Sequence, residues 1–215
     1  MGKKRESIGA EVVWNEAAEE LTLEGEPVLR YSLSWPSVQN GGPGGRWISC
    51  CYGRLAQNWR QRWRREVYWQ ACLALVECRA SGRPFEPWSG RLWGRVTLWK
   101  EGVLSLCMEG EEIRGDGRPC RVKWGDIWNL REGSPVTPRA WFGKGWTKKK
   151  AAEQILRQGR ERQAGGVWLP DGDWEDKVKR AFVPADLWLT EEGARAALPQ
   201  SVLAPAAEGT PEFEI

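Results

Sequence analysis

The chain has 215 residues, enough for one large domain or two small ones with a real hydrophobic core. Its 32 basic and 29 acidic residues leave a net charge of +3, so global charge gives no case for a nucleic-acid partner and only a local basic patch could. The chain has no histidine, which excludes Ser-His-Asp and Cys-His catalytic sites and any zinc site that uses histidine.

The six cysteines contain no Cys-x-x-Cys pair, so zinc-ribbon and thioredoxin-type sites lack their spacing. Buried structural thiols are the favoured role, with disulfides and a reactive or metal-bound thiol as alternatives. We expect no metal and no cofactor. The cysteines are Cys50, Cys51, Cys72, Cys78, Cys107 and Cys120.

The N-terminus resembles the start of a signal peptide, but acidic residues follow at once and no apolar run of seven or more appears. No segment approaches the ~20 apolar residues that cross a membrane. As written, the chain is expected to be cytoplasmic and without a membrane span; a signal or anchor removed from it is the alternative.

Residues 1–19 are mixed in charge and weakly patterned, which predicts a loose N-terminal arm, with a poor first strand as the alternative. Residues 21–23 and 28–35 predict a hairpin, and Pro36 is expected to end its second strand. The glycine-rich stretch 41–45 lacks the Gly-Lys-Ser/Thr ending of a phosphate-binding loop, so it is interpreted as a flexible spacer.

One long amphipathic helix is predicted over residues 46–81, and it is the element around which the chain is organised. Its apolar residues recur mostly at steps of three or four, the spacing that lines one face of a helix. They are Ile48, Tyr52, Leu55, Trp59, Trp63, Val67, Ala71, Ala74, Leu75 and Cys78.

After the helix, hairpins alternate with isolated short helices. This pattern predicts an α+β fold, with an antiparallel sheet of hairpins packed on the long helix and two shorter C-terminal helices. We expect a single domain over 20–215, in two halves at 20–85 and 90–215. The expected strands are 92–99, 103–108, 120–124, 127–130, 187–190 and 194–198, and the expected helices begin after Thr137, Thr147 and Asp173.

Five segments resemble the RsiV-like family in order and spacing. The C-terminal segments LWLTEEG (187–193) and LAPAAEGTPEFEI (203–215) are similar to that family's closing motifs. The stretch 96–106 is similar to its central hairpin, 129–136 to the turn after it, and the strand ending at Trp35-Pro36 to the strand before its long helix. The resemblance covers roughly residues 20–215.

The resemblance implies a binding module. The family includes the extracytoplasmic part of an anti-sigma factor that senses lysozyme by binding it, and a domain attached to a peptidoglycan deacetylase; its members are often extracytoplasmic. This chain departs from the family at two points. The Gly-Gly-Ala-His-Gly turn is absent from 112–119, and Ala206 stands where the family has tyrosine.

Tryptophans concentrated in the expected sheet form the first candidate site. Trp93 and Trp99 share strand parity, opposite to Val96 and Leu98, so one set could leave aromatic surface exposed. An exposed apolar patch usually marks a partner site, and tryptophan is favoured at such sites. The candidate ligand-binding residues are Trp88, Trp93, Trp99 and Trp128, with Trp124 beside them.

A basic cluster on the long helix forms the second candidate. Arginine can hold phosphates while tryptophan stacks on bases or sugars, so this cluster beside Trp59 and Trp63 is the alternative site, for nucleic acid or phosphate. The structural interpretation is that these arginines form the solvent-exposed face of the helix and pair with acidic residues. The four residues are Arg60, Arg62, Arg64 and Arg65.

An enzyme is the third hypothesis, and it would need acidic or thiol groups converging in one pocket. Carboxylates cluster at Glu109, Glu111 and Glu112 and again at 171–176, where helix capping explains them better than chemistry does. We therefore expect a non-enzymatic domain that binds a protein or a cell-envelope glycan. Nucleic acid is not the favoured partner.

Overall fold

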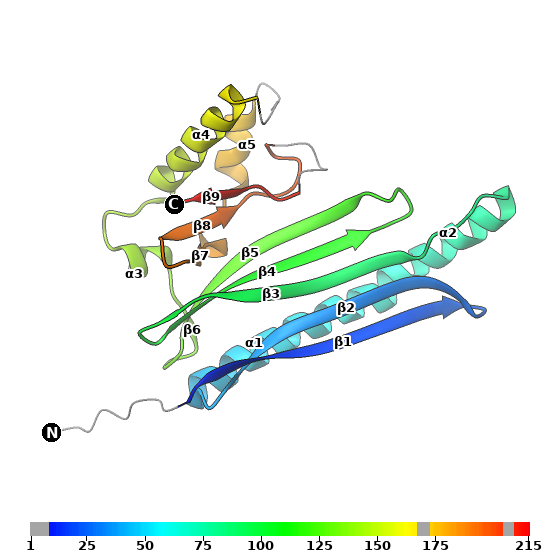
Figure 1. Cartoon of the computed structure of the whole chain (residues 1–215), viewed down its shortest axis with the longest axis horizontal. Helices are drawn as coiled ribbons and strands as arrows, with labels where there is room; N and C mark the ends of the chain where they lie inside the picture. The colour runs from blue at the N-terminus through cyan, green and yellow to red at the C-terminus, as the bar shows by residue number, and fades with distance from the viewer. Residues whose placement is uncertain (1–8, 167–172, 204–208) are drawn as a thin grey trace.

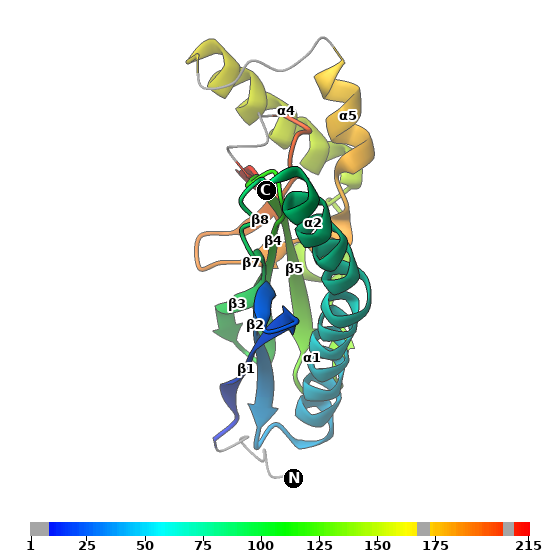
Figure 2. The same ribbon diagram turned by 90° about the vertical axis from the view of Figure 1, so that its right-hand side faces the viewer.

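The computed structural model describes residues 9–166, 173–203 and 209–215. Within these ranges, a six-stranded, mostly antiparallel sheet lies against one long helix, and a three-stranded sheet with shorter helices forms the C-terminal part (Figure 1). Figure 2 shows that the long helix covers one face of the large sheet. The predicted α+β class is confirmed.

The large sheet has the spatial order β1 (Glu11–Leu23), β2 (Glu26–Gln39), β3 (Trp88–Lys100), β4 (Val103–Ile113), β5 (Pro119–Asn129) and β6 (Ser134–Pro135). The small sheet contains β7 (Trp188–Leu189), β8 (Ala194–Ala197) and β9 (Glu212–Glu214). The helices are α1 (Gly42–Arg62), a π-helical segment (Trp63–Val67), α2 (Tyr68–Ser81), α3 (Pro138–Phe142), α4 (Lys148–Ala164), α5 (Trp174–Ala181) and a 3-10 turn (Pro184–Asp186).

The long helix begins at Gly42 and not at residue 46, so the interpretation of 41–45 as a flexible spacer is wrong. Gly44 and Gly45 lie buried in the first turn. A Cβ on Gly44 would overlap the Leu130 carbonyl oxygen and lie 2.8 Å from the Gly133 nitrogen. These glycines therefore let the helix pack against backbone.

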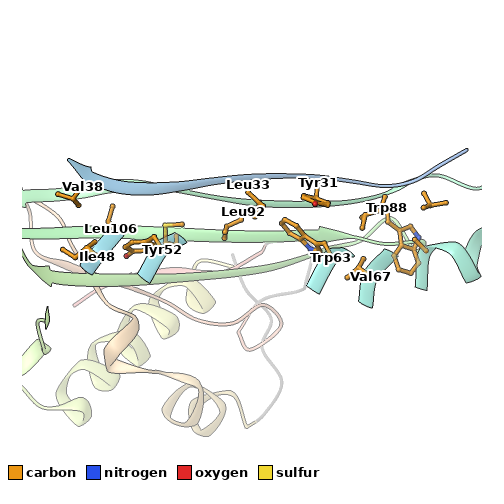
Figure 3. Close-up of a cluster of buried hydrophobic side chains, with 14 of the residues drawn as sticks. Tyr31, Leu33, Val38, Ile48, Tyr52, Trp63, Val67, Trp88, Leu92 and Leu106 are labelled. Carbon is orange, nitrogen blue, oxygen red and sulfur yellow. The ribbon is translucent and has the colours of Figure 1, made fainter. Parts of the chain in front are cut away.

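A π-helical segment interrupts the long helix at Trp63–Val67. Trp63, Val67, Ala71 and Leu75 are buried at successive steps of four, longer than the 3.6 residues of an α-helical turn. The wider π turn takes up the difference, so both halves keep an apolar face on the sheet. Figure 3 shows this core between helix and strands, with Trp63 at its centre.

The N-terminal arm expected over 1–19 is wrong from Glu11 onward, because β1 begins there (residues 1–8 lie outside the described ranges). β1 pairs with β2 from Glu11 opposite Gln39 to Leu23 opposite Glu26, so ladder hydrogen bonds hold a strand that has little apolar alternation. Pro36 does not end β2. Beyond Leu33, β2 pairs with β1 alone, so a proline is tolerated on its open side.

Two hairpins have the same type of turn. Glu24-Gly25 joins β1 to β2, and Glu101-Gly102 joins β3 to β4. All four residues have positive φ, between 52° and 85°, as a two-residue hairpin turn of type I′ requires. The second strand of the first hairpin therefore begins at Glu26, two residues before its predicted start at 28.

One pair of strands departs from the expected antiparallel sheet. β2 and β3 are parallel over Leu29–Leu33 and Trp88–Leu92, joined by the long helix as a crossover. The parallel pairing is short, and beyond Leu92 the outer edge of β3 has no strand partner among the described residues.

The C-terminal part has a second core. Ala151, Ala152, Ile155 and Leu156 of α4 point inward and pack with residues of α5, β8 and β9. Thr147 accepts a hydrogen bond from the Lys150 nitrogen, so its predicted cap is confirmed. Asp173 stands at the start of α5 but makes no side-chain cap hydrogen bond.

The β7 segment lies against the large sheet on the side away from the long helix. A Cβ on Gly125 of β5 would lie 2.6 Å from the Trp188 nitrogen, so glycine is required for this close approach. Ser105 of β4 is fully buried, and its hydroxyl accepts a 2.8 Å hydrogen bond from the Leu189 nitrogen. These contacts fix β7 and its turn onto the sheet.

Candidate functional site

Three members of the predicted basic cluster make contacts within the chain. Arg62 donates to Glu112 (Nε to Oε1, 2.9 Å), and Arg64 pairs with Glu19 at 3.1 Å. Burial raises the pKa of the Tyr31 hydroxyl, the Arg60 guanidinium lies close enough to act in the lowering direction, and the buried Arg60 Nε has no hydrogen-bond partner among the described residues. Arg65 is exposed and has no ion pair with the described residues. The cluster is therefore spread over separate contacts.

Glu112 is the buried partner of Arg62, with an 8% exposed side chain. It accepts hydrogen bonds from Arg62, Arg114 and the indole nitrogen of Trp63 at 2.9–3.1 Å. Burial acts to raise the pKa of Glu112, but these hydrogen bonds outweigh it and hold the pKa below its ordinary value. Arg62 thus has a structural role.

Two of the predicted ligand-binding tryptophans lie in the core. Trp88 is 9% exposed and Trp128 is 8% exposed, and both belong to the cluster beneath the long helix. Trp128 donates a 3.0 Å hydrogen bond from its indole nitrogen to the Tyr52 hydroxyl. Trp124 is partly buried against the same cluster. These three side chains serve packing.

Trp93 and Trp99 do not share a face, contrary to their sequence parity. The pairing of β3 with β4 shifts register between Val96 and Leu98, and such a bulge reverses the alternation of side chains. Trp93 stands opposite Glu109, which faces away from the long helix, whereas Trp99 stands opposite Leu104 of the helix-side core. The two tryptophans line different hollows.

Trp93 lies in a pocket of about 330 Å³ crowded with paired charges. The Arg91 guanidinium sits 4.8 Å from the indole centroid. Glu109 pairs with Arg95 at 2.6 Å and with Lys123 at 3.1 Å. Because these charges already neutralise each other, the pocket offers few free groups to a ligand.

The three carboxylates that could have served an enzyme do not converge. Glu109 and Glu111 face away from the long helix, and Glu111 pairs with Arg121 at 2.6 Å. Glu112 alternates to the helix side. Asp171 lies outside the described residues, and within them no group of three or more His, Cys, Asp or Glu side chains could hold a metal ion.

Trp99 lines a second and larger cleft, of about 570 Å³, together with Trp141. The two tryptophans are 38% and 39% exposed, so each offers indole surface to solvent. The polar groups in this cleft come from Thr97, Lys100, Thr190 and Glu191. Aromatic walls with a few polar groups are typical of ligand sites.

The elements around this cleft are held rigidly. Thr97 lies at the bulge of β3, and its hydroxyl lies 3.0 Å from that of Ser105. Ser105 in turn accepts from Leu189, and the Thr190 nitrogen donates to the Gly193 carbonyl at 2.7 Å. The bulge and the β7–β8 turn are thus tied together through one buried hydroxyl, and the cleft is preformed.

Trp141 was missed in the sequence as a site residue, although a signal was present. Trp141 and Phe142 are neighbours on the five-residue helix α3. Adjacent residues cannot share one helical face, so one of the two aromatics had to point away from the core. Phe142 packs on the core around Ile127 and Leu189, and Trp141 is the exposed one.

Asp126 and Tyr52 form a polar pair between β5 and the long helix, in which Tyr52 is buried and Asp126 is partly buried. The Tyr52 hydroxyl donates a 2.7 Å hydrogen bond to Asp126 Oδ2. Burial raises the pKa of Asp126 to about 6, against smaller lowering effects of hydrogen bonds from Tyr52 and Trp124. Asp186 raises it further, and burial raises the pKa of Asp186 as well.

Comparison with known proteins shows the fold of this chain. No protein-family model matches it, and no curated protein matches it. A solved structure of a DUF3298 family member from Bacteroides fragilis superposes with a TM-score of 0.67 at 12% identity, covering 96% of this chain and 90% of that one. A DUF3298 family protein from Pseudomonas aeruginosa gives 0.55 at 12% identity, covering 96% and 89%.

In the described residues, every helix is too short or too polar to traverse a bilayer.

Proposed function

We propose that this chain is a non-enzymatic, RsiV-like binding domain that recognises a protein or a cell-envelope glycan through the cleft lined by Trp99 and Trp141. The observation that carries the proposal is the pair of half-exposed indoles in one preformed hollow of about 570 Å³. Exposed tryptophan in a rigid hollow is a typical binding hot spot.

The chemistry of the cleft supports binding more than catalysis. Among the residues that line it, Glu191 is the one carboxylate, and none is a cysteine. The two threonine hydroxyls can accept and donate hydrogen bonds to sugar hydroxyls or peptide groups, and the indole faces can pack on sugar rings or apolar side chains. Lys100 adds a cation at the rim.

The structural likeness to two DUF3298 proteins agrees with the sequence resemblance to the RsiV-like family. The outer edge of β3 beyond Leu92, which pairs with no strand in the described part of the chain, also borders the cleft, since Val96, Thr97 and Leu98 line it. An open edge can add a strand from a partner, which favours a protein ligand over a glycan.

The test is a binding assay of the purified chain against lysozyme and against peptidoglycan, at low and high salt. We expect retention at high salt on one of them, because indole packing is not screened by ions. Trp99→Ala and Trp141→Ala should each weaken binding, roughly 30-fold for a hot-spot residue.

Trp47→Ala and Trp69→Ala are the matched controls, since these tryptophans are 54% and 60% exposed on the long helix. They should leave binding unchanged. Equal losses from all four variants, or retention of neither ligand, would refute the cleft as the site. Binding confined to nucleic acid at low salt would shift the function to the arginines of the long helix.

A further inference from the structure

A second surface of different chemistry lies on the C-terminal part, between α4 and α5. A groove of about 510 Å³ runs there, and Ala152 and Leu156 form its apolar floor. Its rim carries the lysines Lys148, Lys149 and Lys179, and Glu153 is the one acid that lines it. An apolar groove with a cationic rim favours the binding of an anionic ligand that also carries an apolar group.

The lysines stand where helix stability disfavours them. Lys148 and Lys149 occupy the first turn of α4, which has no acidic residue, although the positive end of a helix favours negative charge. The neighbouring helix α5 follows the rule, with Glu175 and Asp176 in its first turn and basic residues in its last. No acid of the same turn therefore offsets the positive charge at the start of α4.

The cationic character extends beyond the groove. Residues 139–150 carry Arg139, Lys144, Lys148, Lys149 and Lys150 and no acid. Lys148 and Lys149 are exposed and form no ion pair with the described residues, whereas Lys179 pairs with Asp176 at 3.0 Å. At least two cations at the rim are thus available to a partner.

We propose that this groove docks an acidic peptide segment of a partner protein, with one apolar side chain in the groove and flanking carboxylates on Lys148, Lys149 and Lys179. The shape favours a peptide over a membrane surface. Ala152 and Leu156 are only 6% and 4% exposed, so they form the floor of a hollow and do not project into a bilayer.

The test is fluorescence anisotropy of the whole chain with a labelled synthetic peptide that carries one leucine between flanking glutamates. We expect binding that weakens with salt and is lost when the leucine is replaced by serine or the glutamates by glutamine. Lys148→Gln combined with Lys149→Gln should reduce affinity roughly tenfold or more, as two charge-assisted contacts disappear.

The matched control combines Arg83→Gln with Arg118→Gln, which removes the same charge from exposed positions outside the groove. It should bind the peptide as the unmodified chain does. Absence of peptide binding, equal loss in both double variants, or binding to anionic phosphatidylglycerol vesicles in place of the peptide would each overturn the proposal.

Discussion

Tyr52 and Asp126, 74 residues apart in the chain, join the long helix to β5 through a 2.7 Å hydrogen bond beneath the sheet. The tyrosine hydroxyl is itself the acceptor for the Trp128 indole nitrogen at 3.0 Å. Burial keeps the pKa of Tyr52 well above its ordinary value, so the tyrosine stays neutral and acts as the donor. The free energy of this contact therefore depends on the protonation of Asp126.

Asp126→Asn should change the pH dependence of stability. With an ordinary pKa of 3.8 and a folded value of about 6, Asp126 contributes stability that is present below pH 4 and lost as pH rises through 6. The difference of about 2 units corresponds to ~3 kcal/mol. Since asparagine can still accept from Tyr52, the variant should become the more stable chain above pH 6, in urea unfolding measured from pH 4 to 8.

The exposed Asp116→Asn is the control and should run parallel to the unmodified chain at every pH. A constant offset between Asp126→Asn and the unmodified chain across this range would contradict the assignment.

Removing the Glu112 carboxylate should destabilise the chain at neutral pH. Glu112→Ala leaves Arg62, Arg114 and the Trp63 indole without their shared acceptor, at a cost of about 2–4 kcal/mol. Because the pKa of Glu112 is lowered, its contribution is present above the unfolded pKa and fades as pH falls through the folded one. Urea unfolding of Glu66→Gln, an exposed partner of the same Arg62, should change stability by less than ~0.5 kcal/mol.

Two glycines of α1 should respond in opposite directions to alanine. At Gly44 a methyl group would meet the backbone of Leu130 and Gly133, so Gly44→Ala should cost about 2–4 kcal/mol. At Gly53 a Cβ would meet nothing within 4 Å, so Gly53→Ala should add about 0.5–1 kcal/mol through helix propensity. Thermal unfolding of both variants tests this, and a Gly44→Ala variant that is as stable as the unmodified chain would show that the contact at Gly44 is not tight.

The cysteines should divide by exposure when the native chain is alkylated. All six are free; Cys50 and Cys120 are exposed, and Cys72 and Cys107 are buried. Burial raises the pKa of Cys107 to about 12, so its thiolate is scarce as well as inaccessible. Mass spectrometry after brief iodoacetamide treatment should find Cys50 and Cys120 modified first and Cys107 only after unfolding. Early labelling of Cys107 would mean that β4 opens in the native state.

The sequence predicted elements with strong local signals. The long helix has a sustained apolar period, and the hairpin of β3 and β4 turns at Glu101-Gly102, where the sequence placed it. Of β1, the end at 21–23 was predicted as a hairpin strand, and a poor strand was one alternative for the rest, because pairing with β2, and not its own pattern, stabilises it as a half-buried edge strand. The parallel pairing of β2 and β3 was not predicted, because the partner strands lie more than fifty residues apart and a local sequence pattern does not show which distant strands pair.

The candidate site was predicted only in part. Trp99 was identified as an exposed aromatic. The bulge beside Thr97, which puts Trp99 and Trp93 on opposite faces of the sheet, corresponds to no recognisable sequence pattern. Trp88 and Trp128 were expected on a ligand face and lie in the core. Trp141 comes to the cleft from a helix that follows β6, and only the folded chain brings it beside β3.

The π-helical turn at Trp63–Val67 holds one residue more than a regular α-helical turn would. A π turn takes up an extra residue while the helix on each side of it keeps the same face toward the sheet. Removing one residue there should therefore restore a regular α-helix and leave Ala71, Cys72 and Leu75 toward the sheet, whereas removing one residue within α2 would rotate everything after it by about 100°. Chains sharing this core should therefore differ in length at this turn and keep a constant length in the α-helical stretches on either side.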